Sequence, residues 1–340
     1  MSQVPIDKRK EEHLDIFLTQ DVLSRRFSGW DQVHLSHNAL PEADYKKMDL
    51  SVSFLGYTLP TPLFISCMTG GTERATEINR RLASVAERER IPMGVGSMRV
   101  ALEKKEWLSS FQLKKVTPQL ILLANMGAIQ LNYGVTITDC LYLAEEIEAD
   151  GFVLHLNPLQ ELLQGEGNKN WKGILCKIEA LARALPIPLI IKEVGWGLST
   201  SVAQKLWDVG VKILDVAGAG GTSWSRIEML RTLDKREREV SSVFDDWGIR
   251  TIDAIQSIYQ WKKEITILAS GGIVNGVEGA KAIALGAHLF GITTPLLKSA
   301  CKSEEELESK IFVILKQLRI ALFCSGYYSM QQYRGSIAHQ

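Results

Sequence analysis

Short apolar runs alternate with longer amphipathic segments along the chain from about residue 60 onward. The runs are rich in aliphatic and β-branched residues and predict eight strands, over Pro62–Cys67, Met93–Val95, Gln119–Ala124, Gly151–Leu156, Pro188–Glu193, Lys212–Val216, Thr266–Ala269 and His288–Ile292. Elsewhere apolar positions recur every three or four residues. This spacing predicts helices over Thr76–Arg88, Asp139–Glu148, Trp171–Ala184, Ser201–Asp208, Thr251–Lys263, Gly276–Leu285 and Glu304–Cys324.

The predicted strands are apolar along nearly their whole length, and a crossover segment follows each of them. Such strands are typical of a parallel sheet covered by helices, and eight of them close into a (β/α)8 barrel, the TIM barrel of the α/β class. An open doubly wound sheet is the alternative. It is disfavoured because no G-x-G-x-x-G motif opens the helix after the first strand.

Two regions fall outside this alternation. Residues 1–60 open with a charged stretch and show no long helical period around residues 27–40. We expect them to form an N-terminal arm or lid and a lead-in to a barrel domain of residues 61–340, which includes the C-terminal helix. Residues 217–250 form an inserted loop after the sixth strand, at the end of a barrel where loops carry function. The helix at 304–324 is expected to pack against the barrel or a neighbouring subunit.

Composition and charge narrow the class of protein. The 340 residues include 39 Lys plus Arg and 39 Asp plus Glu, so the formal net charge is zero. Nucleic-acid binding needs a broad basic face, and we expect no such partner. No run reaches the ~18 apolar residues of a membrane span, and Met1–Asp7 lacks a signal-peptide pattern. The five cysteines lie far apart without C-x-x-C spacing, which is typical of reduced core thiols in a cytoplasmic protein.

Glycines end the last two predicted strands, at the edge of a barrel where ligands bind. Gly271 and Gly272 follow the seventh strand, and Gly291–Thr294 ends the eighth just before a helical segment near Pro295. Bare backbone N–H groups and a helix N-terminus favour a phosphate at this place. The alternative is that these glycines are ordinary turn residues.

Polar residues end most of the other strands. Lys192 closes the apolar fifth strand, and a lysine buried in the barrel mouth needs a negative group to meet it; the alternative is a lysine that extends past the strand into water. Asn125 follows the third strand, while Met68–Gly71 and Gly94–Arg99 follow the first and second. This arrangement fits a broad aromatic ligand, and flavin mononucleotide (FMN) is the predicted cofactor, with Lys192 facing the negative charge of the reduced ring.

The fourth strand ends in residues that suit a metal-bound anion. His155 and Asn157 alternate to the same side, and Gln160 and Glu161 follow in the loop above. No second carboxylate lies beside Glu161, which favours Mg²⁺ held mainly by water and substrate phosphates over a protein-caged transition metal. A structural histidine and a solvated glutamate are the alternative.

Short motifs occur in a consistent order from about Arg9 to Leu297. They are Arg9-Lys10-x-x-His13, Met68-Thr69-Gly70-Gly71-Thr72, Val95-Gly96-Ser97-x-Arg99, His155-Leu156-Asn157-x-x-Gln160-Glu161, Lys192-Glu193-Val194-Gly195, Gly218-Ala219-Gly220-Gly221-Thr222-Ser223-Trp224-x-x-Ile227-Glu228 and Ser270-Gly271-Gly272-Ile273. In these motifs the chain resembles the type 2 isopentenyl diphosphate isomerases. The resemblance implies an FMN-containing barrel that interconverts isopentenyl diphosphate and dimethylallyl diphosphate in isoprenoid biosynthesis. It also implies Mg²⁺, NADPH as the reductant of the flavin, and a homo-oligomer, a tetramer or larger.

The resemblance assigns roles to individual positions. Those that match flavin-binding positions are Met68, Thr69, Gly70, Ser97, Asn125, Lys192, Thr222, Gly271, Gly272, Thr293 and Thr294. Those that match positions holding the substrate are Arg9, Lys10, His13, Ser97, Arg99, His155, Asn157 and Gln160, while Glu161 matches the magnesium ligand. The chain departs from the family's pattern at Met98, Gly165, Asn168 and Val274, which concern phosphate contacts and loop geometry.

The implied reaction moves a double bond by a 1,3-allylic proton shift, so one carbon gains a proton and another loses one. We expect the N5 region of the reduced flavin to give and take the proton and Gln160 to position the reacting carbon. His155 and Glu228 are the further catalytic candidates. Basic side chains and Mg²⁺ would neutralise the diphosphate, and the N-terminal arm would close over it as a lid.

Two other functions remain open at this point. An FMN-dependent hydroxyacid oxidoreductase shares the barrel and the flavin site, but such enzymes place a histidine base and arginines after the later strands. Here Thr222-Ser223-Trp224 follows the sixth strand, and His155 lies on the fourth. A flavin-binding protein without turnover is the other alternative, and the set of diphosphate-binding residues disfavours it.

Overall fold

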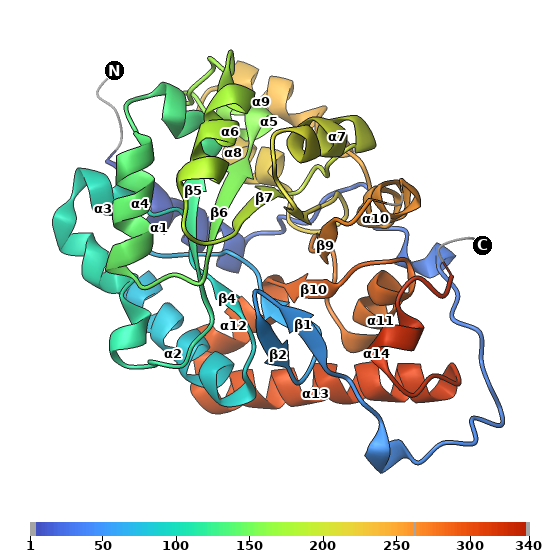
Figure 1. Ribbon diagram of the computed structural model, residues 1–340. Coiled ribbons are helices and arrows are strands. Elements are labelled where there is room, and N and C mark those ends of the chain that lie inside the picture. Colours follow the sequence, from blue (N-terminus) through green and yellow to red (C-terminus); the bar gives the residue numbers. More distant parts are fainter. Residues whose placement is uncertain (1–4, 262, 338–340) are drawn as a thin grey trace.

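Eight parallel strands form a closed barrel in the computed structural model of the chain (Figure 1). The structure describes residues 5–261 and 263–337, so residues 1–4 of the expected arm and of the Met1–Asp7 stretch lie outside the described residues. In barrel order the strands are β3 Leu63–Ile65, β4 Met93–Gly94, β5 Leu122–Gly127, β6 Gly151–Leu156, β7 Leu189–Glu193, β8 Ile213–Asp215, β9 Thr266–Ala269 and β10 Leu289–Ile292. Because β10 also pairs with β3, the barrel is closed. The TIM barrel is confirmed, and the open doubly wound alternative is wrong.

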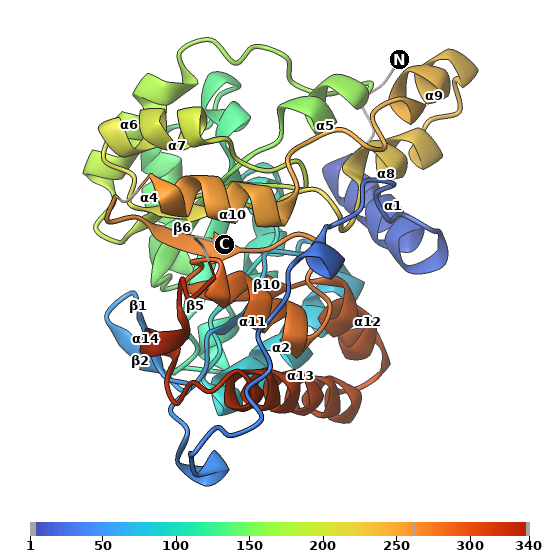
Figure 2. The ribbon, with the colours of Figure 1, turned by 90° about the vertical axis from the view of Figure 1, so that its right-hand side faces the viewer.

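Helices surround the barrel, as Figures 1 and 2 show. The helices that overlap segments predicted as helical are α2 Glu73–Glu89, α4 Ile137–Glu146, α6 Ile174–Ala184, α7 Thr200–Asp208, α10 Thr251–Gln260, α11 Gly276–Ala284, α12 Thr294–Lys302 and α13 Glu304–Cys324. Capping residues set their first turns: Thr72 accepts the Ala75 N–H to begin α2, and a capping box of Thr136 and Asp139 begins α4. None of the helices in the described ranges is long and apolar enough to span a membrane.

Several elements were not predicted. They are the helices α1 Ile6–Thr19, α3 Arg99–Glu103, α5 Pro158–Leu163 and α14 Met330–Tyr333, the strands β1 Val52–Phe54 and β2 Tyr57–Leu59, and the 3-10 turns η1 Trp30–Gln32, η2 Tyr45–Lys47, η3 Lys105–Ser110, η4 Leu113–Lys115 and η5 Ala128–Asn132. The inserted loop contains α8 Trp224–Arg231, which overlaps the helical pattern of residues 227–233, and α9 Lys235–Ser242, which covers the charge run of residues 235–239. The N-terminal arm begins with the helix α1, which lies beside α8 (Figure 2).

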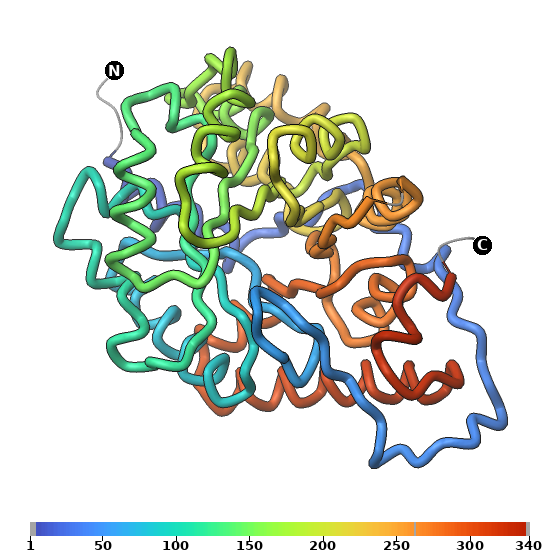
Figure 3. Tube along the Cα trace, viewed as in Figure 1, coloured from blue at the N-terminus to red at the C-terminus, as the bar shows by residue number. Residues whose placement is uncertain are grey.

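The segment between α1 and β1 runs around the outside of the barrel (Figure 3). Hydrogen bonds fix it to the later helices: for example, the Asn38 N–H donates to the Cys324 carbonyl, and the Lys281 ammonium donates to the Trp30 carbonyl. α13 packs on α11, α12 and α2, so the expectation that it covers the barrel is confirmed.

All five cysteines are free, but Cys176 is exposed, so the expectation of a core position is wrong for this thiol.

The barrel interior is apolar at its lower end. Phe64, Leu123, Val153, Ile190, Leu268 and Leu289 point inward, and Phe54 and Leu59 of the β1–β2 hairpin close the barrel from below. Side chains alternate along a strand, so residues two places further along also point inward, at the carboxyl ends of the strands. The fold thus separates an apolar plug from a mouth that can hold a ligand.

Candidate active site

A cavity of about 310 Å³ opens at the carboxyl ends of the strands, within the range of about 300–1,000 Å³ that is typical of small-molecule sites. Every residue assigned above to flavin, substrate or metal lines this cavity. Among the catalytic candidates Gln160 and His155 also line it, whereas Glu228 lies behind the wall and is only 2% exposed. The structure therefore brings together nearly the whole predicted set.

The floor of the cavity is a layer of polar side chains that lie two residues beyond the apolar plug. Its members are Asn125 on β5, His155 on β6, Lys192 on β7 and Ser270 after β9, and the buried Asp215 on β8 belongs to the same layer but does not line the cavity. Sequence reasoning missed Asp215 and Ser270. The alternation along the sixth and seventh strands could have found both, because each lies two positions after an inward-facing aliphatic residue.

Lys192 is 8% exposed and does not extend into water. Its ammonium lies 3.4 Å from a carboxylate oxygen of the buried Asp215 and donates to the Glu193 carbonyl at 2.7 Å. The Ser270 hydroxyl donates to the other Asp215 oxygen at 2.7 Å. The negative group expected opposite Lys192 is thus supplied by the protein itself, and the alternative of a solvated lysine is wrong.

His155 is held as a neutral ring. Asn125 uses its NH₂ group to donate to the Val95 carbonyl, so its Oδ1 accepts from Nδ1 of His155 at 2.7 Å. Burial, followed by the charges of Lys192 and Lys10, lowers the pKa of His155 to about 3. With the proton on Nδ1, the Nε2 atom is left as an acceptor.

Two glycine loops pack backbone against backbone at one end of the cavity. A Cβ on Gly271, whose φ is +97°, would lie 2.2 Å from the Gly218 carbonyl oxygen, and one on Gly272 would lie 2.8 Å from the Gly220 carbonyl. The helix α12 begins beside them at Thr294, whose hydroxyl lies 3.3 Å from that of Thr222. Uncovered N–H groups and a helix N-terminus form a cradle for a phosphate. The residues present therefore fit the phosphate end of FMN.

A pair of oxygen donors lies elsewhere in the cavity. The Asn157 amide NH₂ donates to Glu161 at 3.1 Å and to the Gln160 side-chain carbonyl at 3.2 Å. The Asn168 backbone N–H donates to the second Glu161 oxygen at 2.6 Å. The Asn157 Oδ1 is buried and has no partner within the described ranges. One carboxylate and one free amide oxygen are hard donors that fit Mg²⁺. The described residues contain no group of three His, Cys, Asp or Glu side chains able to hold a metal.

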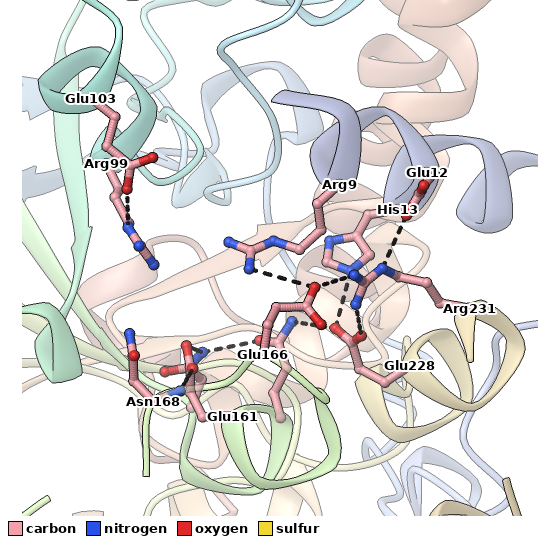
Figure 4. A network of polar contacts seen from close by, with 12 residues as sticks. Arg9, Glu12, His13, Arg99, Glu103, Glu161, Glu166, Asn168, Glu228 and Arg231 are labelled. Atoms are coloured by element: carbon pink, nitrogen blue, oxygen red, sulfur yellow. Dashed lines mark hydrogen bonds and ion pairs between the residues drawn. The ribbon is translucent and has the colours of Figure 1, made fainter. Parts of the chain in front are cut away.

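The helix α1 contributes basic side chains from above. Lys10 donates to the Gly70 and Ser97 carbonyls at 2.6 and 2.8 Å and faces no carboxylate in these contacts. Burial, followed by the charge of Arg9, lowers the pKa of Lys10 to about 7. Arg9 and Arg99 approach the cavity from opposite sides (Figure 4). Arg99 also pairs with Glu103 at 2.6 Å.

Behind the wall, Glu228 joins α1 to the Gln160 side chain. Its Oε1 lies 3.0 Å from Nε2 of His13 and accepts from the Gln160 amide at 3.2 Å. Burial opposes ionisation, but His13, Arg231 and the Gln160 hydrogen bond lower the pKa of Glu228 to about 2. Glu228 is therefore a carboxylate that orients Gln160, and it lies outside the cavity lining.

Three charged residues of this network were not predicted from the sequence. They are Glu12, Glu166 and Arg231, which come from α1, the loop after α5 and α8 (Figure 4). Arg231 lies one turn after Glu228, so the helix period could have linked those two. No sequence signal links Glu12 or Glu166 to them, because their proximity depends on how α1 docks.

The departures from the family's pattern have different surroundings. Val274 lines the cavity and is 46% exposed, while Met98 is fully buried outside the lining. Gly165 has open space around its Cα, and Asn168 contacts Glu161 through its backbone N–H. An asparagine therefore serves as well as other residues for that one contact.

Comparison with known proteins agrees with this geometry. Residues 155–340 match the family described as FMN-dependent dehydrogenase. Isopentenyl-diphosphate delta-isomerases of Rickettsia rickettsii (strain Sheila Smith) and Rickettsia prowazekii (strain Madrid E) are each 48% identical over 319 residues, which cover 94% of this chain and 93% of theirs.

Solved structures share the barrel at low identity. A flavocytochrome b2 variant has a TM-score of 0.70 and 15% identity, covering 96% of this chain and 82% of that one. A mandelate oxidase variant has a TM-score of 0.67 and 14% identity, covering 95% and 94%. These likenesses support the fold alone, whereas the curated relatives identify the family. The chain carries the FMN-dependent dehydrogenase domain and belongs to the isopentenyl-diphosphate delta-isomerase family.

Proposed function

We propose that the protein interconverts isopentenyl diphosphate and dimethylallyl diphosphate in isoprenoid biosynthesis, with FMN, Mg²⁺ and NADPH as the reductant of the flavin. The observation that carries this proposal is that one cavity has two separate anion-binding ends. The glycine loops form one end, and Arg9, Lys10 and Arg99 with Glu161 form the other. A nucleotide cofactor and a diphosphate substrate together would occupy both.

The flavin would lie over the polar floor. Its phosphate fits between Gly271, Gly272 and Thr294, and its ring fits near Lys192 and Asn125. When bound and reduced, FMN supplies an electron-rich ring and nitrogen atoms that can hold a proton. Asp215 already compensates Lys192, so the floor presents a neutral pair to the ring. The Lys192–Asp215 pair thus limits how strongly the site favours a negative charge there.

The diphosphate would lie at the other end. Two arginines and a lysine supply positive charge, and an arginine can bind two phosphate oxygens at once. Glu161 and the free Asn157 oxygen would hold Mg²⁺, which keeps water and phosphate oxygens as its other ligands. Closure of α1 over the mouth would exclude water from the reacting carbons. We therefore assign residues 1–60 as lid and lead-in and residues 61–340 as the barrel domain.

The proton shift requires a fixed reacting carbon. Gln160 is held at both ends of its amide, by Glu228 and by Asn157, so it can position the prenyl chain without turning. Neutral His155 offers an acceptor at Nε2 and adds no positive charge to the site. Replacing Gln160 with Asn would shorten the side chain and withdraw its amide from the prenyl chain, and full turnover by that variant would refute the role.

Two further expectations belong to the whole enzyme. We propose that it is a homo-oligomer, a tetramer or larger, as the resemblance implies. We also propose that it works in the cytoplasm, where reduced thiols persist, because its five cysteines are unpaired.

Omission of single components tests the proposed function. FMN-loaded protein is incubated anaerobically with isopentenyl diphosphate, NADPH and Mg²⁺, with each left out in turn, and the two diphosphates are separated by chromatography. Conversion only in the complete mixture is expected. Flavin reduction by 2-hydroxyacids without conversion would instead support an oxidoreductase. Such an enzyme places its histidine base after a later strand, whereas the histidines that line the described cavity are His13 on α1 and His155 on β6.

A further inference from the structure

Arg231 holds three carboxylates with three different nitrogen atoms (Figure 4). Its Nε donates to Glu12 on α1 at 3.1 Å, its Nη1 donates to Glu228 on α8 at 3.0 Å, and its Nη2 donates to Glu166 in the loop after α5. The arginine side chain is only 12% exposed. It does not line the cavity, so any effect on substrate must pass through these partners.

The three carboxylates come from three different segments, and Arg231 contacts all three of them. Glu228 is 1% exposed at its side chain, Glu166 is 20% and Glu12 is 36%. Without a cation among them, they would repel one another, and the buried Glu228 would lose the guanidinium that compensates its charge. Arg231 is therefore the group that makes their approach favourable.

Each of the three partners leads to a group placed in the cavity. Glu12 lies between Arg9 and His13 on α1. Glu166 lies 4.0 Å from the Arg9 guanidinium and belongs to the loop whose Asn168 N–H holds Glu161. Glu228 accepts from Gln160, which in turn accepts from Asn157. One guanidinium thus connects the basic helix, the proposed metal ligand and the proposed positioning amide.

We propose that Arg231 is a positioning residue that docks α1 on the barrel mouth, so that Arg9, Lys10 and His13 face the diphosphate while Glu228 and the 165–168 loop stay in place. This inference rests on the proposed function, because the diphosphate is the substrate that the proposed function names. The planar fork of arginine is essential to it, since a lysine ammonium is a point charge that cannot meet three carboxylates in this geometry.

Variants of the FMN-loaded full chain test the proposal with two readouts. Amide hydrogen exchange over residues 6–19 reports docking of α1 without substrate, and the KM and kcat for isopentenyl diphosphate report its effect on catalysis. The variants are Arg231→Met, Arg231→Lys and Glu12→Gln. The control is Arg88→Met, which removes an arginine that pairs with Glu304 and Glu308 between α2 and α13.

In Arg231→Met we expect the amide exchange rate of α1 and the KM each to rise by about tenfold or more, because a buried ion pair loses one partner. FMN absorbance should stay that of the parent. Arg231→Lys should recover only part of both effects. Glu12→Gln should speed exchange of α1 while leaving kcat near the parent value, since the Glu228–Gln160 contact remains.

Equal exchange and equal KM in Arg231→Met and Arg88→Met would overturn the proposal. If Arg231→Met does not accumulate as folded protein, Glu12→Gln decides: exchange of α1 at the parent rate would refute the docking role. If α1 exchanges faster in Arg231→Met but the parent protein does not isomerise isopentenyl diphosphate, the docking role stands and the proposed function is refuted.

Discussion

Glu161, the proposed Mg²⁺ ligand, is fixed by two hydrogen-bond donors. The Asn157 amide holds one of its oxygens and the Asn168 N–H holds the other, while the Asn157 carbonyl oxygen stays free beside it. Such orientation of a ligand raises metal affinity because less freedom is lost on binding. Side chains of this site therefore act in pairs, and a change at one of them should have a specific consequence.

Replacing Glu161 with Gln should raise the Mg²⁺ concentration needed for half-maximal activity by about tenfold or more. The cause is loss of the one carboxylate among the proposed ligands. Activity measured against Mg²⁺ concentration checks this, with Glu106→Gln, at an exposed position on η3, as control. An unchanged Mg²⁺ requirement together with parent-like FMN binding would show that Glu161 is not the ligand.

Lys10 should make substrate binding sensitive to pH. Because burial and Arg9 lower its pKa to about 7, Lys10 is charged below this pH and neutral above it in the free enzyme. A neutral amine holds a diphosphate less well, so the KM for isopentenyl diphosphate should rise as pH increases through about 7.

Profiles of KM against pH for the parent and Lys10→Met check this prediction. The variant should have a higher KM in the acid range and lack the rise. Lys8→Met, at an exposed position of the same helix, is the control and should keep the parent profile. A rise of the same size in Lys10→Met would assign it to another group.

At the residue scale, sequence reasoning located the side chains that end strands and missed their partners. Lys192, Asn125 and His155 stand out because each is a polar residue in or after an apolar run. Asp215 and Ser270 occupy equivalent places, and strict attention to alternation would have found them. Glu12 and Glu166 could not be found, because their contacts depend on the docking of α1.

The glycine loops after β8 and β9 act as a unit at the scale of elements. Gly271 and Gly272 contact the backbone of residues 218–221, so neither loop can shift without the other. This close approach, and not chain flexibility alone, requires residues without side chains at these positions.

Gly271→Ala should lower FMN affinity by about tenfold or more, since its Cβ would meet the Gly218 oxygen and displace the cradle. Gly134→Ala is a matched control, because Gly134 has the same φ of +97° with open space around it. It should lose about 1 kcal/mol of unfolding free energy and keep FMN. Titration of the apoprotein with FMN, followed by fluorescence, decides. Equal affinities would contradict a cradle at Gly271.

Elements of the barrel could be predicted because each strand is a short apolar run and most outer helices are strongly periodic. The α1 helix could not, because its sequence is polar and only Ile6, Leu14 and Phe17 are buried. The β1–β2 hairpin has strands of three residues, too short to show an alternation. Both are stabilised mainly by the barrel on which they pack, so local sequence carries little signal for them.

The whole molecule places two anion-binding ends in one mouth over an apolar plug. In the proposed function the strands position the flavin end, and α1 completes the diphosphate end from outside the barrel. The fold is shared with a flavocytochrome b2 variant at 15% identity, so the proposed reaction depends on the residues of the site and not on the barrel itself.

The central claim is that the enzyme shifts a proton of isopentenyl diphosphate. NMR of the reaction in D₂O, with FMN-loaded protein, NADPH and Mg²⁺ under anaerobic conditions, tests it most directly. We expect dimethylallyl diphosphate carrying solvent deuterium in a methyl group, formed only in the complete mixture. Product without deuterium would contradict exchange of that proton with solvent, and flavin-loaded protein that leaves the substrate unchanged would contradict the claim itself.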